Sequence, residues 1–355
     1  MKKIITILIT FALAVVAVPA SAEEESEGLG FSTKEIIFEH LGDSYGWEAP
    51  FCHSVRIPLP IIVRDCYGGW HLFSSSRIQH GETYDGFHIA AEGDNHGKVV
   101  GERTDENGNK VEYRPLDISI TKNVAALIIC ALVVLLCTFS VVRWYRRHGN
   151  KAPRRWTATM EMLVEFVYMG VIRPTLGSKA HKFAPYLLTV FFFILTMNLL
   201  GLIVICPGGA NLTGNLAVTM VLALFTFFIT NVFGSKHYWK DIFWPDVPVW
   251  LKCPIPIMPI IEVFGMFTKP AALMVRLFAN MMGGHMIVIV LTLLIFIFTA
   301  MFGVAAGAGT TVVSVIFSLF MLVLDTLVSF IQAYVFTMLS TLFISLAQAP
   351  EHAHE

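Results

Sequence analysis

The chain has 355 residues, of which 55% are hydrophobic and only 14% are charged. A soluble domain carries about 25% charged residues, and the apolar residues here fall in long blocks. Composition therefore excludes an ordinary soluble globular protein and indicates a polytopic membrane protein. The net charge of -1 gives no reason to expect a nucleic acid as a partner.

The first 22 residues have the pattern of a signal peptide. Lys2 and Lys3 precede an apolar stretch at 4–18, and Ala20-Ser21-Ala22 supplies the small residues of a cleavage site. We therefore predict a signal peptide over residues 1–22, with an uncleaved anchor as the alternative. In both cases the segment that follows is exported.

Residues 23–118 are polar and predict a small exported domain that is partly β. Two strand-like runs, 98–101 and 110–113, flank Asn107-Gly108. An Asn-Gly pair between such runs is a strong β-hairpin signal. The sequence leaves the fold and role of this domain open.

Cysteines and histidines of the exported domain give no firm site. Export permits a disulfide between Cys52 and Cys66, but the sequence does not decide whether it forms. A metal site is not indicated, because no two histidines show the close spacing of metal ligands. We expect these histidines to be solvated: His40, His53, His71, His80, His88 and His96.

Residues 119–355 predict an all-α membrane domain with five membrane helices. The first, 123–142, is followed by a basic cluster at 143–155 that marks the cytoplasmic side. Residues 156–176 are amphipathic and are expected along the cytoplasmic interface. The other predicted spans are 184–206, 216–233, 257–302 and 312–347, with a loop carrying Lys236, Lys240 and Lys252 on the cytoplasmic side. This topology gives a multi-pass membrane protein with an exported N-terminus and a cytoplasmic C-terminus. We expect it in a bacterial inner membrane, with the N-terminus in the periplasm.

The last two apolar segments form a pair that is longer than a membrane is thick. A perpendicular span needs roughly 20 residues, and a longer apolar helix accommodates by tilting. We therefore expect a strongly tilted helical hairpin, with its turn in the Gly-rich run 303–309.

Polar residues inside this hairpin are the candidate functional residues, because ionisable groups at membrane depth are costly. Helical periodicity places Glu262, Lys269 and Arg276 on one face. Asn280 lies one turn beyond Arg276 on nearly the same face. His285, nine residues beyond Arg276, lies on a different face of its helix. On the last helix, one face carries Asp325, Ser329 and Gln332.

An antiparallel hairpin brings these residues to matching levels. Arg276 and Gln332, and likewise His285 and Asp325, are centred on position 304 or 305, inside the Gly-rich run. The His285–Asp325 level lies roughly 10 to 13 Å closer to the exported side, at about 1.5 Å per residue. A contact between His285 and Asp325 would require a helix distortion, such as one at Gly283-Gly284, or a long reach.

Arg276 is the residue that a purely structural interpretation explains least well. Hydrogen bonds between membrane helices account for an amide such as Gln332 or Asn280. An arginine remains charged, however, and a glutamine does not neutralise it. A cation kept at this depth indicates a site for an anion from outside the chain. Lys269 has a second explanation, because its side chain can extend toward the interface.

Four sequence motifs together resemble the F-type ATP synthase subunit a. Residues 269–285 read KPAALMVRLFANMMGGH, and residues 330–337 read FIQAYVFT. Looser matches are MNLLGL at 197–202 and GNLAVT at 214–219. The resemblance covers about 120–350, whereas the signal peptide and the large exported domain depart from the shortest members of the family.

This resemblance implies a proton-translocating, non-catalytic membrane subunit of a rotary motor. Arg276 would face the essential carboxylate of each c subunit in a rotating ring, with Asn280 and Gln332 beside the path. His285 and Asp325 would form the exported-side half-channel, and Glu262 would lie toward the cytoplasmic exit. The implied partners are the c-subunit ring, the b subunits of the peripheral stalk, the rest of the ATP synthase complex and the lipid bilayer. No cofactor is implied, and the chain has no phosphate-binding Gly-x-x-x-x-Gly-Lys-Ser/Thr loop.

Two other classes of function remain as alternatives. A secondary ion transporter usually has internally repeated spans with broken helices, and the five predicted spans are dissimilar. A membrane scaffold would leave Arg276 and the register of the hairpin unexplained. The choice between H+ and Na+ and the size of the c ring are not determined by this sequence.

Overall fold

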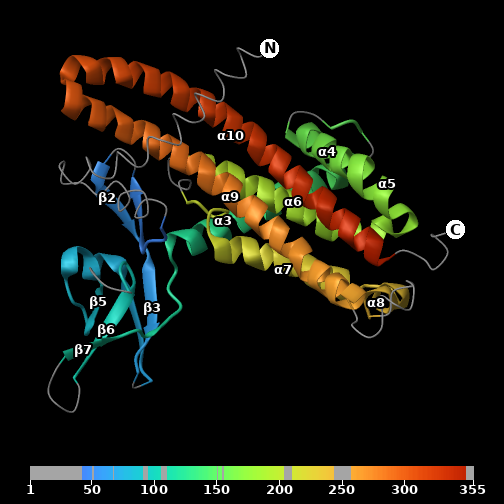
Figure 1. Cartoon of the computed structure of the whole chain (residues 1–355), viewed down its shortest axis with the longest axis horizontal. Coiled ribbons are helices and arrows are strands. Elements are labelled where there is room, and N and C mark those ends of the chain that lie inside the picture. Colours follow the sequence, from blue (N-terminus) through green and yellow to red (C-terminus); the bar gives the residue numbers. More distant parts are fainter. Residues whose placement is uncertain are drawn as a thin grey trace. The chain divides into compact units, whose positions relative to one another are not determined.

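The structure is a computed structural model of the chain (Figure 1). It describes residues 42–49, 52–66, 68–90, 95–104, 110–149, 151–153, 156–203, 210–243 and 257–348. The predicted signal peptide, residues 204–206 at the end of the predicted span 184–206, and Lys252 lie outside the described residues.

The N-terminal part of the described chain is built from short antiparallel strands. Its three sheets have the strand orders β1-β2, β4-β3-β8 and β5-β6-β7 among the described residues. The strands are β1 (Gly46–Ala49), β2 (Cys52–Pro58), β3 (Pro60–Arg64), β4 (Trp70–Ser74), β5 (Phe87–Ile89), β6 (Val99–Thr104), β7 (Lys110–Tyr113) and β8 (Leu116–Asp117), with a 3-10 helix η2 (Ser75–Gly81) after β4. The expectation of a partly β segment is confirmed.

A small apolar core holds this β region together. Ile61 and Val63 alternate along β3 toward the interior and are fully buried, as the two-residue period of a strand requires. Phe73 lies opposite Ile61 in β4. The core also includes Tyr45, Ile78, Phe87 and Val99.

The predicted β-hairpin is present. β6 and β7 pair antiparallel from Gly101 opposite Tyr113 to Thr104 opposite Lys110, and the connecting residues 105–109 lie outside the description. Cys66 is an exposed free thiol, so the structure does not support the disulfide with Cys52. His71 and His88 each pair with a carboxylate, at 2.5 Å to Asp85 and 3.2 Å to Glu112.

The rest of the described chain is helical, as predicted. The helices are α3 (Lys122–His148), α4 (Trp156–Val167), the π-helical turn η3 (Tyr168–Ile172), α5 (Arg173–Leu176), the 3-10 turn η4 (Gly177–Lys179), α6 (Ala180–Leu202), α7 (Leu216–Val232), α8 (Lys236–Phe243), α9 (Ile257–Phe302) and α10 (Val304–Ala347). Four helical segments are long and apolar enough to cross a membrane, or five if α7 and α8 count as one bent span.

The segment 156–176 is helical, as α4, η3 and α5, and it ends at Gly177, whose φ is +55°. Its place along the cytoplasmic interface stays a prediction. One predicted element differs from the structure. The residues Lys236 and Lys240 lie in α8 rather than in a loop, after a bend of 103° from α7.

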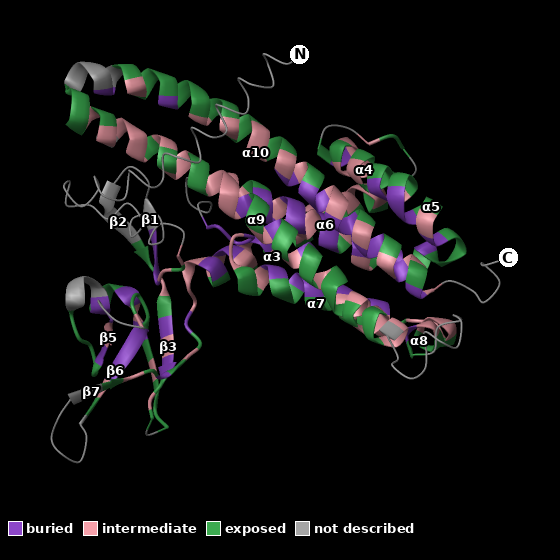
Figure 2. Cartoon of the chain, viewed as in Figure 1, coloured by how far each residue is buried: buried purple, intermediate pink, exposed green. Residues whose placement is uncertain are grey.

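The helix α6 lies at the centre of the helical core. Four large side chains of α6 have no exposed surface, namely Leu187, Phe191, Ile194 and Met197. Figure 2 shows purple residues gathered along α6 and mostly green and pink residues along α9 and α10. The open surfaces of α9 and α10 therefore face lipid or other proteins.

The hairpin turn is shorter than predicted. Only Gly303 interrupts the two helices, and its φ of +83° is the left-handed conformation that glycine adopts without strain. Residues 304–309 already belong to α10, so the fifth helix begins at Val304 and not near 312. A β-carbon on Gly307 would lie 2.1 Å from the Thr299 hydroxyl, so the small residue there permits close approach of the two helices. The hairpin tip, 285–318, belongs to a different compact unit from 43–284 and 319–355.

Candidate functional site

The middle of α9 has a buried side and an open side. Leu273, Leu277 and Met281 follow one another at intervals of four residues and are buried, so they form the stripe that packs α9 against the core. Arg276 and Asn280 lie next to this stripe and are exposed. The packing of α9 thus turns the arginine away from the apolar interior of its own chain.

Arg276 has no partner within the described part of the chain. It makes no hydrogen bond or ion pair to another described residue. The predicted level match with Gln332 does not produce a bond, because Gln332 is only 7% exposed on the inner side of α10 while Arg276 is on the open side of α9. The guanidinium is therefore available to a group from another molecule.

The predicted polar face of α10 points into the protein. Ser329 and Gln332 are buried and Asp325 is half-buried. Farther along the helix the same side is packed by Phe336 and Thr337, which are also buried. Periodicity placed these polar residues on one face, and the structure shows that this face is the inner one.

The carboxylate of Asp325 occupies the space that a side chain at Gly284 would need. A β-carbon built on Gly284 would lie 2.8 and 2.9 Å from the two carboxylate oxygens. The absence of a side chain at position 284 therefore lets Asp325 reach α9 directly. This contact agrees with the antiparallel register that the sequence predicts, one residue before His285.

α9 runs unbroken through Gly283-Gly284, from Ile257 to Phe302. Of the two routes to a contact between His285 and Asp325, a helix distortion there is therefore absent, and a long reach of the side chain remains. His285 is half-buried and belongs to the hairpin tip. Its pairing with Asp325 stays a prediction.

Glu262 and Lys269 lie on the first half of α9. Glu262 is half-buried. Lys269 is exposed, and its ammonium lies 5.9 Å from the centre of the Phe343 ring of α10. Lys269 therefore has a contact within the chain, unlike Arg276, although both are exposed cations on one helix face.

A polar network connects α6 to α10, and sequence reasoning did not single it out. The Asn198 amide donates to the Ser329 carbonyl at 3.4 Å and accepts from the Thr213 hydroxyl at 2.9 Å. A second chain of hydroxyls joins Tyr186, Thr226 and Ser340 at 3.0 and 3.3 Å. An amide in an apolar span is a signal of such a network, and Asn198 is the amide of the MNLLGL motif at 197–202.

The membrane region of the chain matches a known protein family. Residues 124–345 match the family described as ATP synthase A chain. The chain belongs to the ATP synthase subunit a family. As a member, it is a multi-pass membrane subunit that works within the ATP synthase complex in proton transport, and it is not itself the catalytic subunit.

Curated relatives cover most of the same region. ATP synthase subunit a of Chloroherpeton thalassium is 41% identical over 249 residues, which is 68% of this chain and 70% of the relative. The subunit a of Pelodictyon phaeoclathratiforme is 44% identical over 247 residues, 68% of each chain. That of Myxococcus xanthus is 42% identical over 248 residues, 68% of this chain and 76% of the relative.

The N-terminal β region matches a separate family. Residues 36–118 match a domain of unknown function, DUF8433. This match ends four residues before α3 begins at Lys122. The family match of the membrane region therefore says nothing about what the N-terminal part does.

Proposed function

We propose that this chain is the stationary proton path of an F-type ATP synthase, with Arg276 as the cation that separates two offset half-channels. The single observation that supports this role most directly is the exposed guanidinium of Arg276, without a partner among the described residues, on an apolar helix of 46 residues. A charge at membrane depth is costly, so an anion from another subunit is needed to stabilise it.

The partner that fits Arg276 is the mid-membrane carboxylate of each subunit in a c ring. A nearby guanidinium favours the ionised form of a carboxyl group, and arginine stays protonated at every physiological pH. A carboxylate that reaches Arg276 therefore releases its proton. The fixed positive charge also repels protons and so prevents a direct leak between the two half-channels.

A proton route follows from the other polar residues of the hairpin. Protons enter from the periplasmic side through His285 and Asp325, pass the level of Gln332 and Asn280, and protonate a c-subunit carboxylate. Histidine suits the entry because it titrates near neutral pH. After nearly a full turn of the ring, the proton leaves toward the cytoplasm near Glu262. The membrane potential supplies about 2.3 kcal/mol per charge per 100 mV.

The same proposal assigns sides and domains. Residues 1–22 are the signal peptide, 23–118 the exported domain in the periplasm, and 119–355 the membrane domain, with the C-terminus in the cytoplasm of the inner membrane. Basic residues after the first span, among them Arg146 and Arg147 in the last turn of α3, support this orientation. The b subunits of the peripheral stalk hold the chain still while the ring turns.

Arg276→Ala tests the proposal, with Lys269→Ala as a matched control. Both residues are exposed cations seven positions apart on α9. We expect Arg276→Ala to assemble normally and to lose ATP-driven proton pumping, because no cation remains to discharge the carboxylate. Lys269→Ala should keep most of the pumping. Pumping in reconstituted complexes is measured by the quenching of a pH-sensitive dye.

Two outcomes would contradict the proposal. Normal pumping by Arg276→Ala would exclude the role of this residue. Equal loss in both variants, with both complexes assembled, would show that any positive charge on this helix face matters and that Arg276 is not the special one.

A further inference from the structure

One face of the sheet β4-β3-β8 is apolar and points away from the core of the β region. The strand pairing aligns its side chains in two rows of three. One row contains Leu72, Ile62 and Ile118, the last joined to β3 by its backbone N–H to the Ile62 carbonyl. The other row contains Trp70, Arg64 and Leu116. We call these six residues the outer sheet face.

The outer sheet face is open. Leu72 is 72% exposed, Trp70 58%, Ile118 57% and Leu116 56%. The opposite side of the same strands carries Ile61 and Val63 and forms the core. A sheet that already buries one face needs no second apolar face for its own stability, so the outer sheet face indicates an interaction with another phase or molecule.

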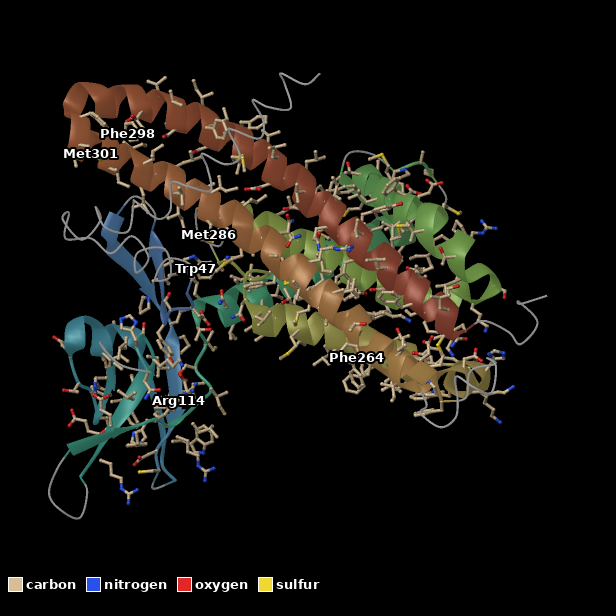
Figure 3. The ribbon with its side chains drawn as sticks, in the orientation of Figure 1. Trp47, Arg114, Phe264, Met286, Phe298 and Met301 are labelled. Atoms are coloured by element: carbon tan, nitrogen blue, oxygen red, sulfur yellow. The ribbon has the colours of Figure 1, made fainter. Side chains whose placement is uncertain are left out.

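Cationic groups adjoin the apolar rows. The Arg64 guanidinium lies 5.7 Å from the centre of the Trp70 ring, and Arg114 is exposed two residues before Leu116 (Figure 3). Arg64 and Arg114 line a shallow hollow of about 280 Å³ beside Leu116. Asp65 also lines it, so the two guanidiniums outnumber one carboxylate.

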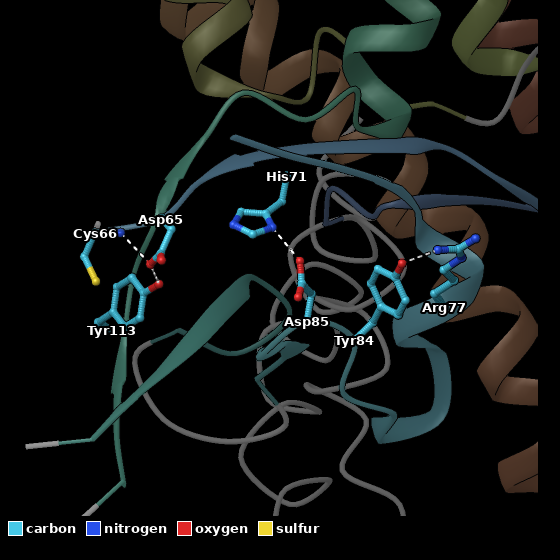
Figure 4. Close-up of polar contacts among 7 residues, drawn as sticks. All are labelled: Asp65, Cys66, His71, Arg77, Tyr84, Asp85 and Tyr113. Atoms are coloured by element: carbon cyan, nitrogen blue, oxygen red, sulfur yellow. Dashed lines mark hydrogen bonds and ion pairs between the residues drawn. The ribbon is translucent and has the colours of Figure 1, made fainter. Parts of the chain in front are cut away.

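The Asp65 carboxylate in the hollow is already engaged. It accepts hydrogen bonds from the Tyr113 hydroxyl and from the Cys66 backbone N–H (Figure 4). The hydroxyl bond lowers the pKa of Asp65, and the carboxylate is therefore ionised and paired at neutral pH. The guanidiniums remain the groups that can meet a phosphate.

The sheet is tied to the start of the first membrane helix. Ile118 lies four residues before Lys122, at most about 14 Å along the chain. The Ile120 N–H donates to the Pro60 carbonyl at 3.2 Å, and the Lys122 N–H donates to the Ser44 carbonyl at 2.8 Å. The outer sheet face is thus held near the point at which α3 enters the membrane.

We propose that the outer sheet face rests on the lipid bilayer beside α3 and contacts the headgroups of anionic phospholipids. Leu72, Ile118 and Leu116 lie at the boundary between headgroups and acyl chains. Trp70 takes the interfacial position that tryptophan favours in membrane proteins. Arg64 and Arg114 bind lipid phosphates, which guanidiniums contact through paired N–H groups.

Lipid fits this face better than a protein partner does. A standard protein–protein interface involves about 20–30 residues on each side, and the outer sheet face has six. Its combination of aliphatic side chains, a tryptophan and flanking arginines is the chemistry of interfacial membrane binding. Continuity with α3 also places a bilayer surface within reach of the sheet, on whichever side the helix begins.

Spin labels on the full chain in lipid nanodiscs test this proposal. Leu72→Cys and Leu116→Cys are labelled in a background without native cysteines. The matched control is Arg103→Cys, an exposed position on β6 in the sheet β5-β6-β7. Collisions with oxygen, which dissolves in bilayers, are compared with collisions with a water-soluble nickel chelate. We expect oxygen to be favoured several-fold at positions 72 and 116 and the nickel chelate to be favoured at position 103.

Each other result overturns the proposal. Nickel access at 72 and 116 equal to that at 103 means that the face is in water. Shielding from both reagents means that another subunit or a second copy of the chain covers it. If the cysteine-free chain does not fold, a photoactivatable phospholipid applied to the native chain must crosslink to residues 70–72 or 116–118, and its absence there has the same meaning as nickel access.

A second comparison tests the headgroup contact. Replacing part of a zwitterionic lipid by phosphatidylglycerol should lower nickel access at position 116, and Arg64→Gln should reduce this effect. An equal effect in the Arg64→Gln chain would exclude the assignment of Arg64 to the headgroups.

Discussion

The variant Gly284→Ala adds one methyl group at the point where α10 touches α9. Its β-carbon would lie 2.8 and 2.9 Å from the Asp325 carboxylate oxygens and 3.0 Å from the Cγ atom of Asp325. Either the carboxylate leaves its position or the two helices move apart. Inserting a methyl group into a packed site costs about 1–3 kcal/mol, which corresponds to a factor of roughly 5 to 140 in the population of the native arrangement.

The neighbouring glycine is a matched control. A β-carbon on Gly283 would have no atom within 4 Å. Both substitutions replace glycine by alanine inside α9, and both therefore gain up to about 1 kcal/mol of helix propensity. The difference between Gly283→Ala and Gly284→Ala isolates the clash with Asp325.

The assay is passive proton conductance through membranes that carry the complex without its catalytic part. We expect Gly283→Ala to conduct as the parent chain does. Gly284→Ala should conduct less, because Asp325 no longer holds its place on the proposed entry path, while the level of assembled complex stays the same. Equal conductance in the two variants would refute the placement of Asp325 against Gly284.

Three further predictions concern other parts of the chain. Asn198→Leu leaves the Thr213 hydroxyl and the Ser329 carbonyl without their amide partner. The loss of stability should be about 1–3 kcal/mol, so the detergent-solubilised complex should aggregate at a lower temperature. An unchanged aggregation temperature would contradict this. Burial, then the hydrogen bond to Asp117, raises the pKa of Tyr45 above its usual value of about 10. The stability that this raised pKa provides is present below pH 10 and is lost as the pH rises further. Proteolysis of the N-terminal β region should therefore accelerate above pH 10, and this acceleration should be smaller in Tyr45→Phe than in the parent chain. Finally, cysteines at His285 and Asp325 should crosslink with a short reagent, whereas efficient crosslinking only in a shifted register would exclude the proposed pairing.

The helical hairpin could be predicted from the sequence because its signals are local. Two apolar segments of 46 and 44 residues separated by a glycine leave little choice of connection. The register also follows, since the polar residues must be level across the pair. The length of the turn did not follow, because Gly303 alone reverses the chain and the small residues after it are equally compatible with a helix and with a loop.

The N-terminal sheets were less accessible to prediction. Asn107-Gly108 identifies the pairing of β6 with β7, since that pairing is local. The pairing of β3 with β8 joins Arg64 to Leu116, more than 50 positions apart, and no local pattern specifies it. The outer sheet face consequently could not be recognised from the sequence, because five of its residues come from three separate strands and Ile118 directly follows the third.

The candidate site was predicted by residue type, and the structure adds the direction in which each residue points. Helical periodicity sorts Arg276, Asn280 and Gln332 into faces, but it does not say which face meets the core. That choice is made by the stripe of Leu273 and Leu277, which packs inward and leaves the arginine outside.

The direction in which the polar side chains of α10 point matters for how the hairpin works. Asp325, the one acidic residue of α10, lies against Gly284, so it does not compete for Arg276. A carboxylate within the chain that paired with Arg276 would hold the guanidinium and weaken its effect on a carboxylate from outside. The inward turn of the polar face of α10 therefore supports the proposed function, because it leaves the guanidinium of Arg276 available to each c subunit in turn.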